Sequence, residues 1–233
     1  MKEITQVLKL SLLIFLVPFL SINACLLISV NYSFLDNTIF AVDFIGRSNF
    51  TIPYIDGSLS ISRASRTFPQ YFIFKPAMII TGIFVTLYWY KTNIFFKKIV
   101  HKQKNFYFRF FGIISAIFLI LHSIFLGIKF DLTFFKFLKR VFLLGFIIFE
   151  ISAQTSLIYN IYKYKSSIQE YFNINILRLK MILVFLLIVI ALASLPILGL
   201  KDYVHFKHAL EWNYFIGIIS FYLLTRFFWK KTT

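Results

Sequence analysis

The sequence predicts an all-α fold, a polytopic membrane bundle of six transmembrane helices with one long external or luminal loop. The first observation is composition, because hydrophobic residues make up 59% of the 233-residue chain and aromatic residues 21%. A soluble domain could not cover so much apolar side chain with polar surface. The second is that six apolar stretches are each about 20 residues long, the length a helix needs to cross the hydrocarbon core. We therefore expect a single integral membrane domain over residues 1–233.

The six predicted spans are residues 10–30, 71–90, 110–128, 141–162, 181–200 and 209–229. The first span has an alternative interpretation, because Lys2 and Lys9 followed by an apolar run and Cys25 also resemble a cleaved signal. The apolar run continues to Val30, however, and Asn23 suits a lipoprotein cleavage site badly. We therefore expect the span to be retained. Cys25 is the one cysteine in the chain, so no intramolecular disulfide is possible.

The connection over residues 31–70 is the longest and is predicted to fold back over the mouth of the bundle. It contains too many apolar and aromatic residues for a disordered segment, and connections longer than about 15 residues tend to be functional. The alternating apolar residues of 50–55 permit a short strand or hairpin that turns at Asp56-Gly57.

A basic, hydroxyl-rich patch leads from this loop into the second span. Arginine suits bidentate binding of phosphate, and hydroxyl and amide groups add hydrogen bonds. A phospholipid headgroup, such as a phosphoinositide, is therefore a candidate ligand. The alternative is that these are ordinary charges reaching from an apolar surface to water. The polar residues of the patch are Ser60, Ser62, Arg63, Ser65, Arg66, Gln70 and Lys75.

Glu150 stands near the middle of the fourth span, where an ionised carboxylate costs about 2.5–3.5 kcal/mol. His122 in the third span reaches nearly the same depth, so we predict a His122–Glu150 hydrogen bond, which Asn23 could join. The pair is either a polar clamp between helices or a proton relay or general acid–base pair. The clamp is favoured, because no nucleophile accompanies the pair.

A second polar group lies at the outer mouth of the sixth span. His208 and Glu211 share one helix face, with His205 a turn earlier. That spacing could hold a metal, but no cysteine or third helix supplies further ligands. We expect no metal and no cofactor, and a structural or headgroup-facing role for His208, Glu211 and Trp212. Glu211 is also predicted to form an ion pair with Lys75, although both groups could instead be solvated.

The distribution of basic residues among the loops predicts how the chain is oriented in the membrane. With both termini cytoplasmic, 15 of the 25 lysine and arginine residues lie inside, as the positive-inside rule requires. The sequons at Asn31 and Asn49 then fall in the outer or luminal loop. The net charge of +16 does not favour nucleic-acid binding, because the basic residues occupy short loops that face anionic headgroups. We expect a Golgi or ER membrane in a eukaryote and the inner membrane in a bacterium.

The patch before the second span resembles the signature of the Frag/DRAM/Sfk family, in which a long first loop enters the second of six membrane helices. Arg63 stands near where many members have an acidic residue, and the usual glycine after the Ile-Ser pair is missing. The residues that carry the resemblance are Ile61-Ser62, Pro69-Gln70, Tyr71, Phe72, Phe74, Lys75, Tyr88-Trp89 and Ala209-Leu210-Glu211-Trp212.

The resemblance is closest to the branch that completes lipid remodelling of GPI anchors. It implies a protein that acts on or presents a phospholipid or GPI lipid at the outer or luminal leaflet, by lipid acyl transfer if it is an enzyme. The other branches imply a non-enzymatic membrane scaffold or regulator with a membrane-protein partner. The chain carries no recognisable acyltransferase, hydrolase or nucleotide motif, and the lack of an internal repeat disfavours a transporter.

Overall fold

The computed structural model describes residues 2–30, 51–101, 106–128, 133–198, 200 and 202–230, and within these ranges the protein is helical and contains no strand. The elements are α1 (Lys2–Val30), α2 (Pro53–Asp56), α3 (Ile61–Ser65), α4 (Gln70–Val100), α5 (Tyr107–Phe125), α6 (Thr133–Lys163), α7 (Lys165–Ile168), the 3₁₀ turn η2 (Gln169–Tyr171), α8 (Ile174–Leu198) and α9 (Val204–Phe228).

Five of the described helices, α1, α4, α5, α6 and α8, are long and apolar enough to cross a membrane. The described residues confirm the predicted all-helical fold, and five such helices agree with a multi-pass membrane protein. Each predicted range overlaps one long helix, and several helices run further, as α4 does to Val100. Helices can continue past the hydrocarbon core because basic side chains such as Lys97 and Lys98 are solvated at the membrane surface. The helix α9 also has 25 residues, with His205, His208 and Glu211 in its first turns.

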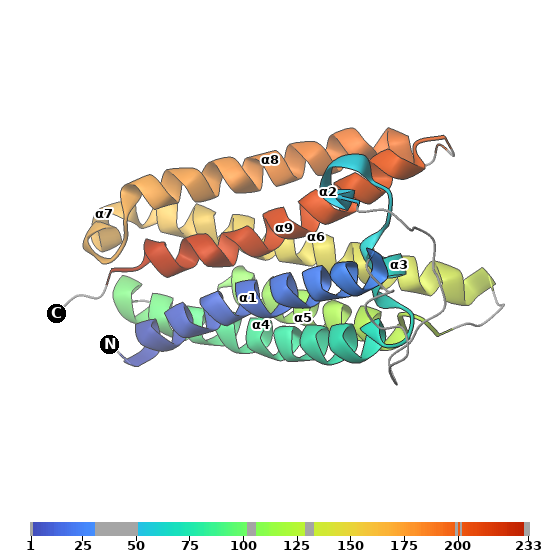
Figure 1. Cartoon of the computed structure of the whole chain (residues 1–233). Coiled ribbons are helices and arrows are strands. Elements are labelled where there is room, and N and C mark those ends of the chain that lie inside the picture. The colour runs from blue at the N-terminus through green and yellow to red at the C-terminus, as the bar shows by residue number, and fades with distance from the viewer. Residues whose placement is uncertain are drawn as a thin grey trace.

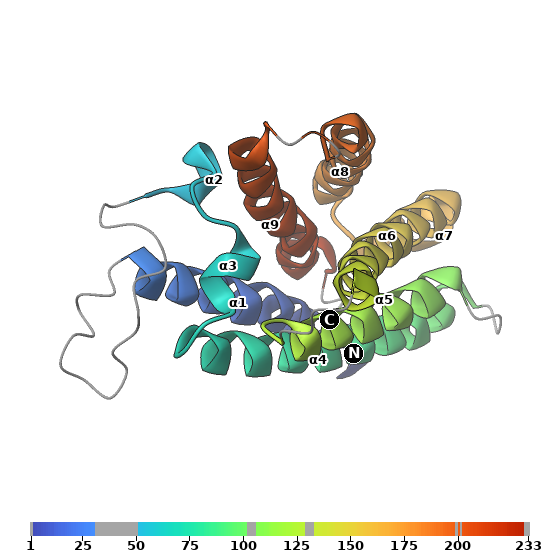
Figure 2. The ribbon, with the colours of Figure 1, turned by 90° about the vertical axis from the view of Figure 1, so that its right-hand side faces the viewer.

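The six long helices form a ring in the order α1, α4, α5, α6, α8, α9, each packing on the next and α9 returning to α1 (Figure 2). The start of α1 and the end of α9 lie together at one end of the bundle, and α2 and α3 lie at the other, which we call the loop end (Figure 1). Close approach of α5 to α4 requires Gly112, because a Cβ atom there would overlap the Trp89 ring.

Residues 51–60 fold back onto the loop end of α9. The Trp212 indole N–H donates to the Leu59 carbonyl oxygen at 2.7 Å, and the Asn213 side chain donates to the Tyr54 carbonyl oxygen at 2.7 Å. The rings of Tyr54 and Trp212 are 4.9 Å apart. Burial raises the pKa of Tyr54, so its hydroxyl stays protonated and donates to Asn23 Oδ1 at 3.0 Å.

The predicted strand or hairpin is wrong for residues 51–55, because Pro53–Asp56 form a helical turn instead. Proline is favoured at the first position of a helix. The Asp56 carboxylate accepts hydrogen bonds from the backbone N–H groups of Ile52 and Ser58, which closes the turn. Gly57 then ends it with a left-handed φ of 59°, as the predicted turn at this position requires. Residues 31–50 of the loop, with Asn31 and Asn49, lie outside the described residues.

Candidate functional site

A cavity opens at the loop end between α3, α4, α5, α6 and α9. Its outer part, the vestibule, has a volume of about 660 Å³. Its inner part, the inner pocket, is narrower, with about 80 Å³ measured in the same way. The vestibule alone is within the size range of small-molecule sites in proteins.

The vestibule is basic. Three cationic side chains line it, Arg66 after α3 and Lys139 and Arg140 on α6. The Lys139 ammonium donates to the Ile128 carbonyl oxygen at 3.2 Å, while Arg66 and Arg140 are exposed. Glu211 is the one acidic residue among the lining residues of the vestibule. Such a surface suits an anionic group, because arginine offers two parallel N–H donors to phosphate.

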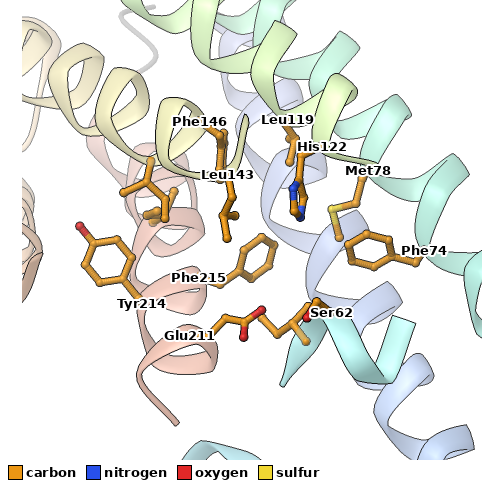
Figure 3. Close-up of a pocket in the computed structure, with 13 residues that line it drawn as sticks. Ser62, Phe74, Met78, Leu119, His122, Leu143, Phe146, Glu211, Tyr214 and Phe215 are labelled. Carbon is orange, nitrogen blue, oxygen red and sulfur yellow. The ribbon is translucent and has the colours of Figure 1, made fainter. Parts of the chain in front are cut away.

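Ser62, His122 and Glu211 lie at the boundary between the two parts, which we call the throat, because each of them lines both. They come from α3, α5 and α9 and surround the same space in Figure 3. The backbone N–H of Ser62 donates to the Glu211 carboxylate. The His122 Nδ1 atom is buried and has no hydrogen-bond partner within the described part of the chain. This ring nitrogen has almost no surface open to the cavity, so a ligand could use it only after the ring turns.

The inner pocket is apolar beyond the throat. Its wall contains aliphatic, thioether and aromatic side chains from α3, α4, α5, α6 and α9 (Figure 3). The hydroxyl of Tyr214, another lining residue, donates to the Leu187 carbonyl oxygen at 3.1 Å. The lining thus changes from a charged mouth to a hydrocarbon-like interior across two adjoining spaces that share Ser62, His122, Leu143 and Glu211. The apolar lining residues are Ile61, Phe74, Met78, Leu119, Leu143, Phe146, Ile147, Phe215 and Ile218.

The predicted His122–Glu150 hydrogen bond is wrong. The Glu150 carboxylate instead accepts from the Ser115 hydroxyl at 2.6 Å, and His122 is seven residues, about two turns or roughly 10 Å, further along α5. The two helices are staggered, so equal counts from their ends do not give equal depths. Asn23 does not join Glu150 either, because its amide donates to the Phe19 carbonyl oxygen at 2.8 Å.

The surroundings of Glu150 agree with a polar clamp. Its carboxylate accepts from the Gln154 amide at 3.0 Å and from the Tyr222 hydroxyl. With Ser115, the contacts join α5, α6 and α9 in the interior. Glu150 is 1% exposed and does not line the vestibule or the inner pocket.

The predicted Lys75–Glu211 ion pair is also wrong. The Lys75 ammonium donates to the Ile124 carbonyl oxygen at 3.3 Å, on the α5 side of α4, whereas Glu211 faces the throat. Among the described residues, the ion pair that forms is between Lys98 and Glu3. Both partners of the expected pair lie at the loop end as predicted, but on different helix faces.

The structure divides the residues predicted to bind a headgroup. Ser62, Arg66 and Glu211 come together in the cavity wall, but Arg63 is exposed outside it. The Ser60 hydroxyl caps α3 by accepting from the Arg63 backbone N–H at 3.2 Å. Gln70 is fully buried between α4 and α1, where it contacts the Ser29 hydroxyl at 3.3 Å.

The remaining members of the predicted set anchor the loop. His208 Nδ1 lies 3.0 Å from the Gly57 carbonyl oxygen, and His205 Nδ1 lies 3.3 Å from the same atom. His205 and His208 are thus on the face of α9 that contacts the loop, whereas Glu211 lines the throat. Trp212 is fully buried. A polar or aromatic residue at a helix mouth thus has two possible uses, ligand binding and loop attachment, which the sequence alone does not separate.

Two groups of buried or cavity-lining basic residues were not predicted from the sequence. Lys139 and Arg140 line the vestibule, and the signal that could have found them is a pair of adjacent basic residues entering the fourth span. Lys180, which stands just before the predicted fifth span of residues 181–200, is fully buried in α8. Its ammonium donates to the Thr225 hydroxyl at 2.6 Å and lies 3.8 Å from the centre of the Phe221 ring, which is a cation–π contact.

No family model, curated protein or solved structure matches this chain. The resemblance to the Frag/DRAM/Sfk family therefore stays a prediction that depends on the motifs themselves.

Proposed function

We propose that this protein binds an anionic phospholipid at the loop end of its bundle, with the phosphate in the vestibule and hydrocarbon in the inner pocket. The observation that carries the proposal is the change of polarity from the vestibule to the adjoining inner pocket. The mouth offers Arg66, Lys139 and Arg140, and the interior is formed by apolar side chains. A small polar metabolite would leave the inner pocket unfilled, whereas a lipid matches both parts.

The proposed role is to act on or present a phospholipid or GPI lipid in the outer or luminal leaflet, as the resemblance implies. Phosphatidylinositol fits the vestibule, because its phosphate can pair with arginine and its hydroxyls with Ser62 and Glu211. The throat lies between headgroup and hydrocarbon, at the depth of an ester bond. If the protein is an enzyme, His122 is the group at that depth that can serve as a general base.

The second candidate function is a non-enzymatic scaffold or regulator that holds the same lipid as a bound component. Among the described residues no hydrogen bond joins His122 to Glu211, so the histidine lacks the carboxylate partner that supports a triad-type general base. This observation favours lipid presentation without catalysis.

We further propose that α9 is a sixth span, that both termini are cytoplasmic and that residues 31–70 are external or luminal. In support, α9 closes the ring between α1 and α8, two helices apolar enough to cross a membrane. The start of α1 and the end of α9 lie at the same end of the bundle, which agrees with an even number of crossings. The compartment would be the Golgi or ER, or the bacterial inner membrane.

Cysteine labelling tests this topology. Arg63 precedes α4 and Lys230 follows α9; both are exposed, they belong to opposite ends of the bundle, and the buried Cys25 gives little background. In sealed vesicles of known sidedness, Arg63→Cys should react with an impermeant maleimide from the external or luminal side and Lys230→Cys from the cytoplasmic side. Reaction of both variants from the same side would contradict six spans.

Lipid retention tests the proposed function. Replacing Arg66 and Arg140 together with alanine should reduce binding of phosphatidylinositol at least tenfold, because each charge-assisted hydrogen bond contributes about 1.5–3 kcal/mol. Binding would be measured by native mass spectrometry of protein titrated with phosphatidylinositol and, separately, with phosphatidylcholine.

Arg63→Ala is the matched control, since Arg63 is exposed next to the cavity but does not line it. It should retain phosphatidylinositol like the unmodified protein. Equal affinity of the double variant and the unmodified protein, or an equal loss in the control, would reject the vestibule as the headgroup site.

A further inference from the structure

The inner pocket ends at a ring of apolar side chains, which we call the collar. A second hollow lies beyond it, and the same five residues line both spaces. The second hollow has a volume of about 10 Å³, about enough for one water molecule. The collar therefore separates a pocket that can receive a ligand from a space that cannot. The collar residues are Met78, Leu119, Phe146, Phe215 and Ile218.

The second hollow is deeper in the bundle by about one helical turn. On α4 its wall continues from Met78 to Thr81, and on α6 from Phe146 to Glu150. On α9 it continues to Tyr222. Three helices therefore give the same depth difference, about 5.4 Å along the helix axis.

The wall beyond the collar is partly polar, although its polar groups are already used. The Glu150 carboxylate accepts from Ser115, Gln154 and Tyr222. The Thr81 hydroxyl donates to the Ala77 carbonyl oxygen at 2.7 Å. A hydrocarbon chain that passed the collar would have to displace packed side chains and then lie against this buried carboxylate, and both changes are unfavourable.

We infer that the collar sets the maximum length of the lipid acyl chain that the inner pocket accepts, so that the protein selects its lipid by chain length as well as by headgroup. This inference rests on the proposed function, because it takes an acyl chain as the occupant. The basic vestibule supports that occupant, since an anionic phospholipid bound there directs its hydrocarbon toward the apolar interior. The methyl end of the longest accepted chain contacts Met78 and Phe146.

Enlarging the collar tests the inference. Phe146→Ala should join the two hollows and lengthen the best-bound chain by about four carbons, because one helical turn of 5.4 Å is about the length of four methylene groups. The probes are monoacyl phosphatidylinositols with saturated even-numbered chains from butanoyl to lauroyl, because the throat and the collar are only three to seven residues apart on α5 and α9, about 5–10 Å. Native mass spectrometry of the full-length protein gives the relative affinity for each chain.

Met78→Ala is a second collar variant, for the case in which Phe146→Ala does not fold, because methionine is among the more tolerant core residues to replace. Leu143→Ala is the matched control. Leu143 lines the vestibule and the inner pocket but not the second hollow, so its truncation enlarges the cavity only on the side of the mouth. The preferred chain length should stay unchanged in this control.

The outcomes separate the two proposals. If the collar variants prefer a longer acyl chain and Leu143→Ala keeps the preference of the unmodified protein, the collar sets the maximum chain length. An unchanged preference in both collar variants, or the same shift in the control, overturns it while leaving lipid binding intact. If the unmodified protein binds none of the probes, the proposed function fails, and the inference fails with it.

Discussion

Replacing Glu150 with alanine is expected to lower the free energy of unfolding by about 3 kcal/mol. The substitution leaves the Ser115 hydroxyl, the Tyr222 hydroxyl and the Gln154 amide without their shared acceptor. A buried donor left unpaired costs about 1–3 kcal/mol, although single hydrogen bonds in membrane bundles contribute less, about 0.6 kcal/mol on average. Denaturant-induced unfolding in detergent micelles, followed by tryptophan fluorescence, would measure the change.

Glu150→Gln separates the clamp from a role that needs ionisation. The amide keeps one acceptor oxygen, and hydroxyl groups can rotate to accept from its N–H, so the expected loss is about 1 kcal/mol or less. Ser152→Ala is a control on the same helix, because the Ser152 hydroxyl donates to the Ile148 carbonyl oxygen within α6. Equal destabilisation by glutamine and alanine would show that the negative charge itself is needed.

Hydropathy located the helices well because lipid leaves the backbone few alternatives. A spanning segment must satisfy its own hydrogen bonds, so an apolar stretch of suitable length becomes a helix. The depth of a residue in one helix relative to residues in the neighbouring helix was less predictable. The stagger between α5 and α6 depends on side-chain packing, such as the contact of Ser115 with Glu150, and such packing between helices cannot be read from span boundaries.

The candidate site was predicted in part. Ser62, Arg66, His122 and Glu211 were all singled out from the sequence, but the grouping of His122 with Glu211 and not with Glu150 required the three-dimensional arrangement. The cavity wall includes α3, whose position follows from the attachment of residues 51–60 to α9. Loop attachment depends on backbone carbonyl groups such as that of Gly57, and carbonyl groups carry no signal in the sequence.

Gly57→Ala is expected to detach residues 53–59 from α9. The free energy that holds this segment on the helix should fall by about 3 kcal/mol or more. Gly57 has a φ of 59°, a conformation in which alanine is strained, and a Cβ atom would overlap the His205 carbonyl oxygen. Backbone atoms of α9 cannot move aside as a flexible side chain can. Hydrogen exchange should show faster exchange in residues 53–59, and the emission of Trp212 should shift to longer wavelength as its ring becomes hydrated.

Ser58→Ala provides the neighbouring control. The Ser58 hydroxyl is buried and has no hydrogen-bond partner in the described part of the chain, so its removal should leave exchange in this segment unchanged. Because α3 follows the anchored segment directly, Gly57→Ala should also weaken phosphatidylinositol binding through Ser62 and Arg66, while the Glu150 contacts in the interior persist. Unchanged protection of residues 53–59 would contradict the anchoring role of Gly57. If residues 53–59 lose their protection from hydrogen exchange while phosphatidylinositol binding is unchanged, the attachment of this segment to α9 is not needed for the lipid site in the vestibule.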